Sequence, residues 1–158
     1  MALELTILVG TTNGIAQLVA QEIELRIEGD DLKVTTLPMD ELDGGVFAHG
    51  GLFLICTSTY GKGDVPDNAT QLYESLQTAR PDLSHVRYGV FALGDMTHAK
   101  NFCNGGKRFD RVLTELGAKR IGEMALHDLS SGSLPEDEAA DWIEGWIALC
   151  RQELGMET

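Results

Sequence analysis

Three short segments of this chain carry residue types that could bind a ligand, and each follows an apolar run. The first is residues 10–16, Gly-Thr-Thr-Asn-Gly-Ile-Ala, which joins the run Leu3–Val9 to a helical pattern at Ile15–Ile27. Hydroxyls, an amide and free backbone N–H groups at a helix N-terminus favour an anion such as a phosphate. Because the segment has no Lys or Arg, the predicted cradle is neutral. A turn in which Thr11 to Asn13 merely cap the helix is the alternative.

The second segment, residues 57–68, places one large aromatic side chain among glycines and hydroxyls after the apolar run Leu52–Cys56. Tyr60 can stack on a flat ring, and Gly61 and Gly63 let the backbone approach that ring at low steric cost. A surface tyrosine on a flexible loop is the alternative interpretation.

The third segment, residues 94–106, is long, polar and bounded by glycines, and it follows the apolar run Tyr88–Leu93. Long loops in compact domains are usually functional. His98 and Phe102 supply planar groups, although a histidine such as His98, taken alone, is more often a solvated loop residue. Together the three segments offer a phosphate cradle and two ring-bearing loops, which a mononucleotide with a broad planar ring requires.

Strand and helix patterns alternate along the chain, and this alternation determines where the three segments lie. Short apolar or alternating runs predict strands, and an apolar period near 3.6 predicts helices between them. The expected strands are Leu3–Val9, Leu32–Leu37, Leu52–Cys56, Tyr88–Leu93 and Arg120–Leu126, and the expected helices are Ile15–Ile27, Ala69–Ala79, Gly106–Leu116 and Glu136–Leu154.

These elements predict an α/β, doubly wound sandwich formed by one domain over residues 1–158. The expected sheet is parallel and five-stranded, of order 2-1-3-4-5, with helices on both faces. This order buries strands one, three and four. Ligands of such folds bind outside the carboxyl ends of the strands at the switch point, here between strands one and three. All three segments would meet there.

Composition narrows the class of protein. The chain has 158 residues, of which 43% are hydrophobic and 23% charged, as in ordinary globular proteins. No membrane span or signal peptide is expected. The three cysteines are widely separated without a CxxC pair, which favours a reducing, cytoplasmic setting. The net charge of −13 disfavours nucleic acid and anionic membranes and favours basic protein partners, with simple solubility as the alternative explanation.

The three segments also resemble those of the flavodoxin family. TSTYGKGDVPDN, which begins at Thr57, is similar to the flavin loop of flavodoxins and of the FMN domains of diflavin reductases. ALGDMTHAKNFCNGGKRFD and ELGAKRIGE resemble the family's third loop, helix and final strand. HDLSSGSLPEDEAADWIEGWI is similar to the C-terminal end of MioC-like short flavodoxins. The family's long insertion into the last strand is missing, so the chain resembles a short-chain flavodoxin with a flavodoxin-like sheet.

The resemblance implies that the cofactor is one FMN held by all three segments. The first would bind the phosphate, the second would wrap one side of the isoalloxazine with Tyr60 stacked on a face, and the third would line the other side. The implied cofactor-binding residues are Thr11, Thr12, Asn13, Gly14, Ile15, Ala16, Ser58, Thr59, Tyr60, Gly61, Lys62, Gly63, Leu93, Gly94, Asp95, His98, Asn101, Phe102 and Cys103. Asn13 and Ile15 replace two family hydroxyls, so backbone amides must bind more of the phosphate. His98 stands where many relatives have a second stacking aromatic.

The function implied by the resemblance is electron transfer without catalysis, because the sequence shows no catalytic set and no metal-ligand spacing. As a monomer the protein would pass single electrons from a basic NAD(P)H-dependent flavoprotein reductase to an acceptor enzyme through transient contacts. Carboxylates such as Asp64 and Asp95 would oppose the negative charge of reduced flavin. One unit charge about 8 Å away, at an effective dielectric near 20, costs about 2 kcal/mol.

Three other functions stay open at this point. A quinone reductase that uses NAD(P)H can share this fold. A phosphoacceptor response regulator also shares it, but needs clustered acids where this chain has Thr11 and Thr12. A non-redox binding module that has lost tight FMN binding is the third, and it is motivated by Asn13 and Ile15.

Overall fold

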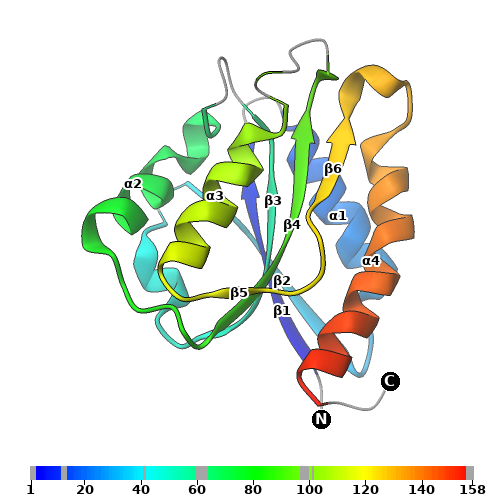
Figure 1. The fold of residues 1–158 in the computed structure, drawn as a ribbon. Coiled ribbons are helices and arrows are strands. Elements are labelled where there is room, and N and C mark those ends of the chain that lie inside the picture. The colour runs from blue at the N-terminus through cyan, green and yellow to red at the C-terminus, as the bar shows by residue number, and fades with distance from the viewer. Residues whose placement is uncertain are drawn as a thin grey trace.

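A parallel sheet forms the centre of the protein in the computed structural model, which describes residues 3–11, 14–40, 42–59, 64–96, 100 and 102–155 (Figure 1). The described residues form six strands: β1 (Leu3–Gly10), β2 (Leu32–Pro38), β3 (Gly51–Thr57), β4 (Val86–Gly94), β5 (Lys119–Arg120) and β6 (Ala125–Asp128). Their order is β2-β1-β3-β4-β5, with β6 also paired to β4, and every pairing between them is parallel. The predicted order 2-1-3-4-5 is therefore confirmed.

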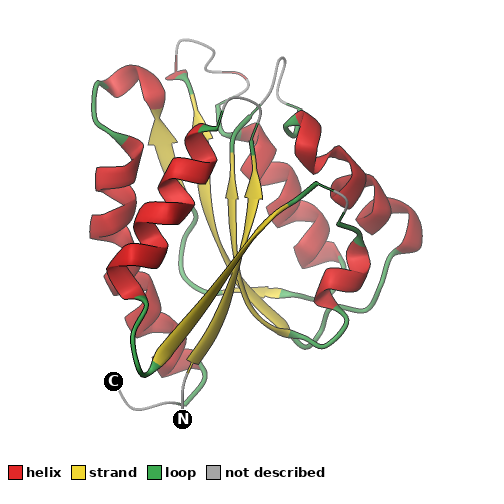
Figure 2. Ribbon diagram, turned by 180° about the vertical axis from the view of Figure 1, so that it is seen from behind, coloured by secondary structure: helices red, strands yellow, loops and turns green. Residues whose placement is uncertain are grey.

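The described residues form four α-helices, which cover the two faces of this sheet (Figures 1 and 2). They are α1 (Ile15–Ile27), α2 (Thr70–Ala79), α3 (Asn104–Glu115) and α4 (Pro135–Glu153), and short 3-10 turns occur at η1 (Gly44–Phe47), η2 (Asp67–Ala69) and η4 (Leu129–Ser131). Helices α1 and α4 pack on one face, and α2 and α3 pack on the other. No helix within the described ranges is long and apolar enough to cross a membrane.

The central strand β3 is apolar on both sides because both faces of the sheet are covered. Leu54 and Ile55 are neighbours in sequence, and both are fully buried. Successive side chains of a strand point to opposite faces. Leu54 accordingly packs in the core against α1 and α4, whereas Ile55 packs in the core against α2 and α3. This is why the run reads as continuous apolar sequence and not as an alternation.

The last strand differs from the expected single run Arg120–Leu126, because it is divided into β5 and β6 by residues 121–124. Gly122 has a φ of +71°, a left-handed conformation that interrupts an extended chain. The indole N–H of Trp146 donates to the Ile121 carbonyl at 2.9 Å. Trp146 of α4 thus binds the Ile121 carbonyl, which in a continuous strand would accept a hydrogen bond from a neighbouring strand.

Strands β1, β3 and β4 end level with one another, and this alignment positions the three polar segments. Gly10 of β1 is paired with Thr57 of β3, and Thr57 is paired with Ala92 of β4. The chain leaves the sheet within one or two residues of these positions. The segments that follow therefore start side by side at the carboxyl edge of the sheet, as predicted.

Candidate functional site

The first segment turns from β1 into α1 through a left-handed glycine. Gly14 has a φ of +87°, and its amide donates to the Thr11 hydroxyl oxygen at 2.8 Å. The Leu18 amide donates to the Gly14 carbonyl at 3.2 Å, so the helix is hydrogen-bonded from its first turn. The first amides of a helix have no intrahelical acceptor and carry the positive end of its dipole. This geometry suits an anion bound by uncharged donors, and the accepting Thr11 hydroxyl keeps its own hydrogen to donate.

Asn68, in η2, ties this first segment to the end of the second one. Its side-chain oxygen accepts from the Thr11 amide at 2.7 Å, and its side-chain nitrogen donates to the Val9 carbonyl at 3.2 Å and to Asp40 Oδ1 at 3.0 Å. Sequence reasoning missed this residue, because an Asn two positions after Pro66 has the pattern of an ordinary helix start.

The second segment is fixed to the third by the hydroxyl of Thr59. That hydroxyl donates to the Leu93 carbonyl at 3.1 Å and accepts from the Gly105 amide at 2.9 Å. The preceding residue, Ser58, donates its amide to the Gly10 carbonyl at 2.9 Å. The strand end of β3 therefore touches both neighbouring segments, through Ser58 on one side and Thr59 on the other.

Thr59→Val is expected to lower the free energy of unfolding by about 1–3 kcal/mol, because a carbonyl and an amide both lose their hydrogen-bond partner in a partly buried position. Thr59→Ser keeps the hydroxyl and serves as the control, with an expected loss below about 1 kcal/mol. Urea unfolding followed by circular dichroism measures both. A Val variant as stable as the unsubstituted protein, together with a loss in the Ser variant, would show that the methyl group, and not the hydroxyl, stabilises this junction.

The third segment is packed so closely, against itself and against the second segment, that two of its positions exclude a side chain. A Cβ on Gly94 would lie 2.4 Å from the Cys103 nitrogen, and one on Gly105 would lie 2.2 Å from the Ser58 carbonyl oxygen. Cys103 itself has a φ of +55° and precedes α3. Its buried thiol faces the Ala92 carbonyl at 3.5 Å, and burial raises the pKa of Cys103 to about 12. Only the backbone of Cys103 can therefore face a ligand outside the sheet.

Asp128, at the end of β6, holds the start of the third segment. Its Oδ1 accepts from the Met96 amide at 3.0 Å, and also from the Ser130 amide and hydroxyl at 2.9 and 2.7 Å. These bonds hold the pKa of the Asp128 carboxyl below its usual value, and the bond from the Met96 amide has the largest effect. Asp128 was not among the predicted site residues, because nothing in the sequence brings β6 beside residue 96.

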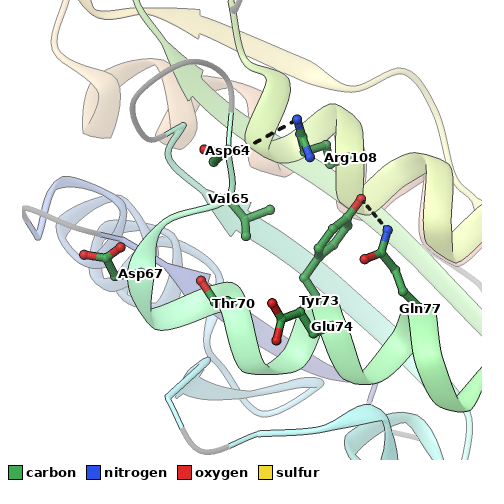
Figure 3. Close-up of a pocket in the computed structure, with 8 residues that line it drawn as sticks. All are labelled: Asp64, Val65, Asp67, Thr70, Tyr73, Glu74, Gln77 and Arg108. Atoms are coloured by element: carbon green, nitrogen blue, oxygen red, sulfur yellow. Dashed lines mark hydrogen bonds and ion pairs between the residues drawn. The ribbon is translucent and has the colours of Figure 1, made fainter.

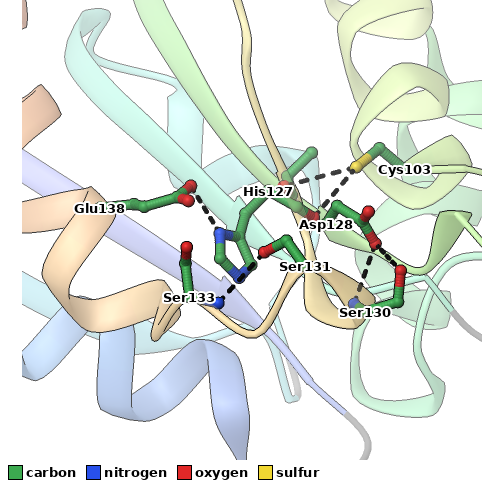
Figure 4. Close-up of polar contacts among 8 residues, drawn as sticks. Cys103, His127, Asp128, Ser130, Ser131, Ser133 and Glu138 are labelled. Atoms are coloured by element: carbon green, nitrogen blue, oxygen red, sulfur yellow. Dashed lines mark hydrogen bonds and ion pairs between the residues drawn. The ribbon is translucent and has the colours of Figure 1, made fainter.

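Behind Asp128 lies a buried histidine on the same strand. His127 Nδ1 is 2.6 Å from Glu138 Oε2 of α4, and its side chain is fully buried. Its Nε2 is buried without a hydrogen-bond partner among the described residues. This pair joins β6 to the first turn of α4, so it supports the strand end from which Asp128 reaches the third segment (Figure 4).

A groove between α2 and α3 adjoins the second segment (Figure 3). It has a volume of about 400 Å³ and is lined by Asp64, Val65, Asp67, Thr70, Tyr73, Glu74, Gln77 and Arg108. Arg108 of α3 forms an ion pair with Asp64 at 3.6 Å across its upper end. Both side chains are exposed, so the pair adds little stability. It does place a cation beside one of the two carboxylates that the sequence suggested would oppose a reduced flavin.

The structure brings the described members of the predicted set to one edge of the sheet. Thr11, Gly14, Ile15 and Ala16 lie at the start of α1; Ser58 and Thr59 follow β3; Leu93, Gly94 and Asp95 end β4 or follow it; Phe102 and Cys103 precede α3. The other predicted residues, Thr12, Asn13, Tyr60, Gly61, Lys62, Gly63, His98 and Asn101, lie outside the described residues. Within the described ranges no group of three or more His, Cys, Asp or Glu side chains could hold a metal ion.

Comparison with known proteins decides the family. The family model described as flavodoxin matches residues 7–142. The chain belongs to the flavodoxin family. It is 41% identical to flavodoxin YqcA of Escherichia coli (strain K12), over 92% of this chain and 97% of the relative. It is 33% identical to protein MioC of Escherichia coli O157:H7, over 94% of this chain and 99% of the relative. Both relatives support the resemblance to short flavodoxins.

Two further comparisons extend this result to a reductase domain and to a solved structure. The chain is 37% identical to the sulfite reductase [NADPH] flavoprotein alpha-component of Bacillus subtilis (strain 168), over 90% of this chain and 23% of the relative. The structure of a cysteine-to-alanine mutant of flavodoxin from Pseudomonas aeruginosa matches with a TM-score of 0.82 and 30% identity, over 93% of this chain and 98% of that one. The flavodoxin fold is thereby shown, and the family's cofactor is FMN.

The described geometry fits this cofactor. An FMN phosphate needs uncharged donors at a helix N-terminus, and the turn through Gly14 into α1 supplies them. A flat ring needs backbone that can come close on both sides. A Cβ on Gly105 would collide with the Ser58 carbonyl, so the second and third segments meet in backbone contact. The Ser58 amide bonds to the Gly10 carbonyl, at the start of the first segment. The chain is therefore a flavodoxin-type FMN protein.

Proposed function

We propose that this flavodoxin is a one-electron carrier that takes electrons from an NAD(P)H-dependent flavoprotein reductase and passes them to an acceptor enzyme. The observation that supports the proposal most directly is the convergence of three segments at the carboxyl ends of β1, β3 and β4. Ser58 bonds to Gly10, and Thr59 bonds to Leu93 and Gly105, so the three segments form one connected surface.

In this proposal the first segment, residues 10–16, holds the FMN phosphate and is called the phosphate loop below. Residues 58–63 and 93–95, with 98 and 101–103, line the two sides of the flavin ring. FMN when bound supplies reversible one-electron chemistry. The protein orients the ring and keeps part of it away from water. The Thr59 hydroxyl and the Asp128 carboxylate hold the two lining segments in position.

The expected partners follow from charge and from family. A net charge of −13 steers basic protein surfaces toward the chain and accelerates their association more than it tightens the complex. The Bacillus subtilis relative is named as the flavoprotein component of an NADPH-dependent reductase and is about four times longer than the matched part. We propose that a separate, basic reductase carries the NAD(P)H site and supplies this chain with electrons. Small, transient contacts suit such a carrier, which we propose acts as a monomer in the cytoplasm.

FMN titration of the apoprotein tests the proposal. We expect quenched flavin fluorescence, a dissociation constant of about 1 μM or tighter, and stepwise anaerobic reduction through a one-electron reduced state seen by absorption. Riboflavin, which lacks the phosphate, is the matched control and should bind at least about tenfold more weakly. If the protein does not bind FMN, the result would contradict the proposal and favour a non-redox binding module. Turnover of NADPH with a quinone by the isolated protein would favour an enzyme of the quinone reductase type.

A further inference from the structure

Asn68 makes a set of contacts that the proposed cofactor chemistry does not by itself explain. Its side chain bonds to the end of β1 and to the turn after β2, while its own backbone belongs to the end of the second segment. We propose that Asn68 is the positioning residue of the phosphate loop, fixing the point at which that loop leaves the sheet. This inference rests on the proposed function, because it deepens the description of the same site.

The two bonds from Asn68 to β1 continue the hydrogen-bond ladder beyond the place where β2 ends. In a parallel ladder, the N–H and C=O of one residue pair with a carbonyl and an amide on either side of one residue of the neighbouring strand. Asn68 does this with a side-chain amide, because it pairs with the Val9 carbonyl and the Thr11 amide, which flank Gly10. Strand β2 ends at Pro38, whose register partner is Val9, and the Met39 amide donates to the same Val9 carbonyl at 2.9 Å. The Thr11 amide lies beyond that point, and Asn68 supplies the acceptor that a longer β2 would have supplied.

Asp40 determines the orientation of the Asn68 side-chain amide, that is, which side its nitrogen and its oxygen face. The amide nitrogen donates to Asp40 Oδ1 at 3.0 Å and to the Val9 carbonyl, so both of its hydrogens have acceptors. The amide oxygen is therefore left for the Thr11 N–H, at 2.7 Å. A carboxylate at position 68 could not repeat this arrangement, because it has no hydrogens to donate and would lie beside the Asp40 charge.

The consequence for the phosphate loop is that its first residues are held in place. With its amide occupied by Asn68, Thr11 presents its hydroxyl, which in turn accepts from Gly14 at the start of α1. The chain path from β1 to the helix N-terminus is thus fixed at both ends. Asn68 also lies in η2, where the second segment ends. The support of the phosphate loop is therefore attached to the segment proposed to line the flavin ring.

Substitution of Asn68 tests the proposal in two measurements on the full chain. In Asn68→Ala we expect FMN and inorganic phosphate each to bind about tenfold or more weakly, and riboflavin affinity to change by less than about threefold. We also expect hydrogen exchange of the Thr11 amide, followed by NMR in the apoprotein, to accelerate about tenfold or more, because that amide loses its acceptor. Asn68→Asp should weaken phosphate binding at least as much as Asn68→Ala does.

Gln71→Ala is the matched control. Gln71 is also an amide side chain near the start of α2, and it donates to the Leu42 carbonyl at 3.2 Å without contacting the phosphate loop. Its removal should change FMN affinity by less than about twofold. Asp40→Ala removes only an exposed acceptor of Asn68, so it keeps the test available if Asn68 variants fail to fold. We expect it to weaken FMN and phosphate binding about threefold.

Two results would overturn the inference. One is an Asn68→Ala protein, or an Asp40→Ala protein if the former does not fold, whose FMN affinity matches that of Gln71→Ala. The other is an equal loss of FMN and riboflavin affinity, which would make Asn68 a general support of the site. If the unsubstituted protein binds no FMN, the proposed function fails, but Thr11 exchange still decides whether Asn68 fixes the loop. Unchanged exchange in Asn68→Ala would then refute the positioning role.

Discussion

Gly105→Ala is expected to destabilise the protein by about 3 kcal/mol and to weaken FMN binding by at least about tenfold. The added methyl carbon would lie 2.2 Å from the Ser58 carbonyl oxygen and 3.2 Å from the Thr59 Cα, and these are backbone atoms that cannot rotate away. Helix α3 would therefore have to move away from the end of β3. That movement would also stretch the bond from the Gly105 amide to the Thr59 hydroxyl, now 2.9 Å long.

Gly145→Ala provides the control for this prediction. Gly145 also lies inside a helix, α4, but a Cβ there would meet no atom within 4 Å. The same substitution should stabilise the protein by about 1 kcal/mol, because alanine favours the helix and glycine does not. Urea unfolding and FMN titration of both variants give the comparison. Two variants of similar stability and affinity would show that the backbone contact at Gly105 relaxes at no cost.

The course of the chain was predictable because the strands and helices differ in period. Leu52–Cys56 is apolar throughout, Ile15–Ile27 repeats every three to four residues, and both elements occur as expected. Parallel strands joined by helices have few topologies, so the switch point followed from the strand assignment. The convergence of the three polar segments was predictable for the same reason.

The interactions that hold those segments were not predictable, because they depend on distances between residues far apart in sequence. Asn68 and Thr11 are separated by 57 positions, and Met96 and Asp128 by 32. Thr59 shows the limit in another way. Its position in the second segment was foreseen, but its hydroxyl bonds to the Leu93 carbonyl and the Gly105 amide of the protein and does not point toward a ligand.

The division of the last strand into β5 and β6 was also unpredictable because it depends on a contact between residues far apart in sequence. Arg120–Leu126 has a strand-like pattern, and no local signal apart from one glycine argues against it. The division depends on Trp146, which belongs to a helix, lies 25 residues further along the chain and takes the Ile121 carbonyl. A local propensity was overridden by a tertiary hydrogen bond, which is the usual reason for such errors.

The second large effect is expected at the switch point itself. Gly10→Ala should destabilise the protein by about 2–3 kcal/mol, because its Cβ would lie 2.5 Å from Thr57 Oγ1 and 3.1 Å from Met39 Sδ. Thr57 is fully buried and is paired with Gly10 across β1 and β3. The substitution would therefore force apart two strands at the edge where the phosphate loop begins.

A double-mutant cycle separates this collision from a general intolerance of alanine at position 10. Thr57→Ala alone removes a hydroxyl that donates to the Ser58 carbonyl, at an expected cost of about 1 kcal/mol. In the double variant the shortest contact is gone and the Thr57 Cβ remains at 3.2 Å, which the strands can accommodate with a small shift. The double variant should thus be more stable than the two single losses predict, by at least about 1 kcal/mol. Additive losses in urea unfolding would mean that Gly10 is needed for its backbone and not for the space beside Thr57.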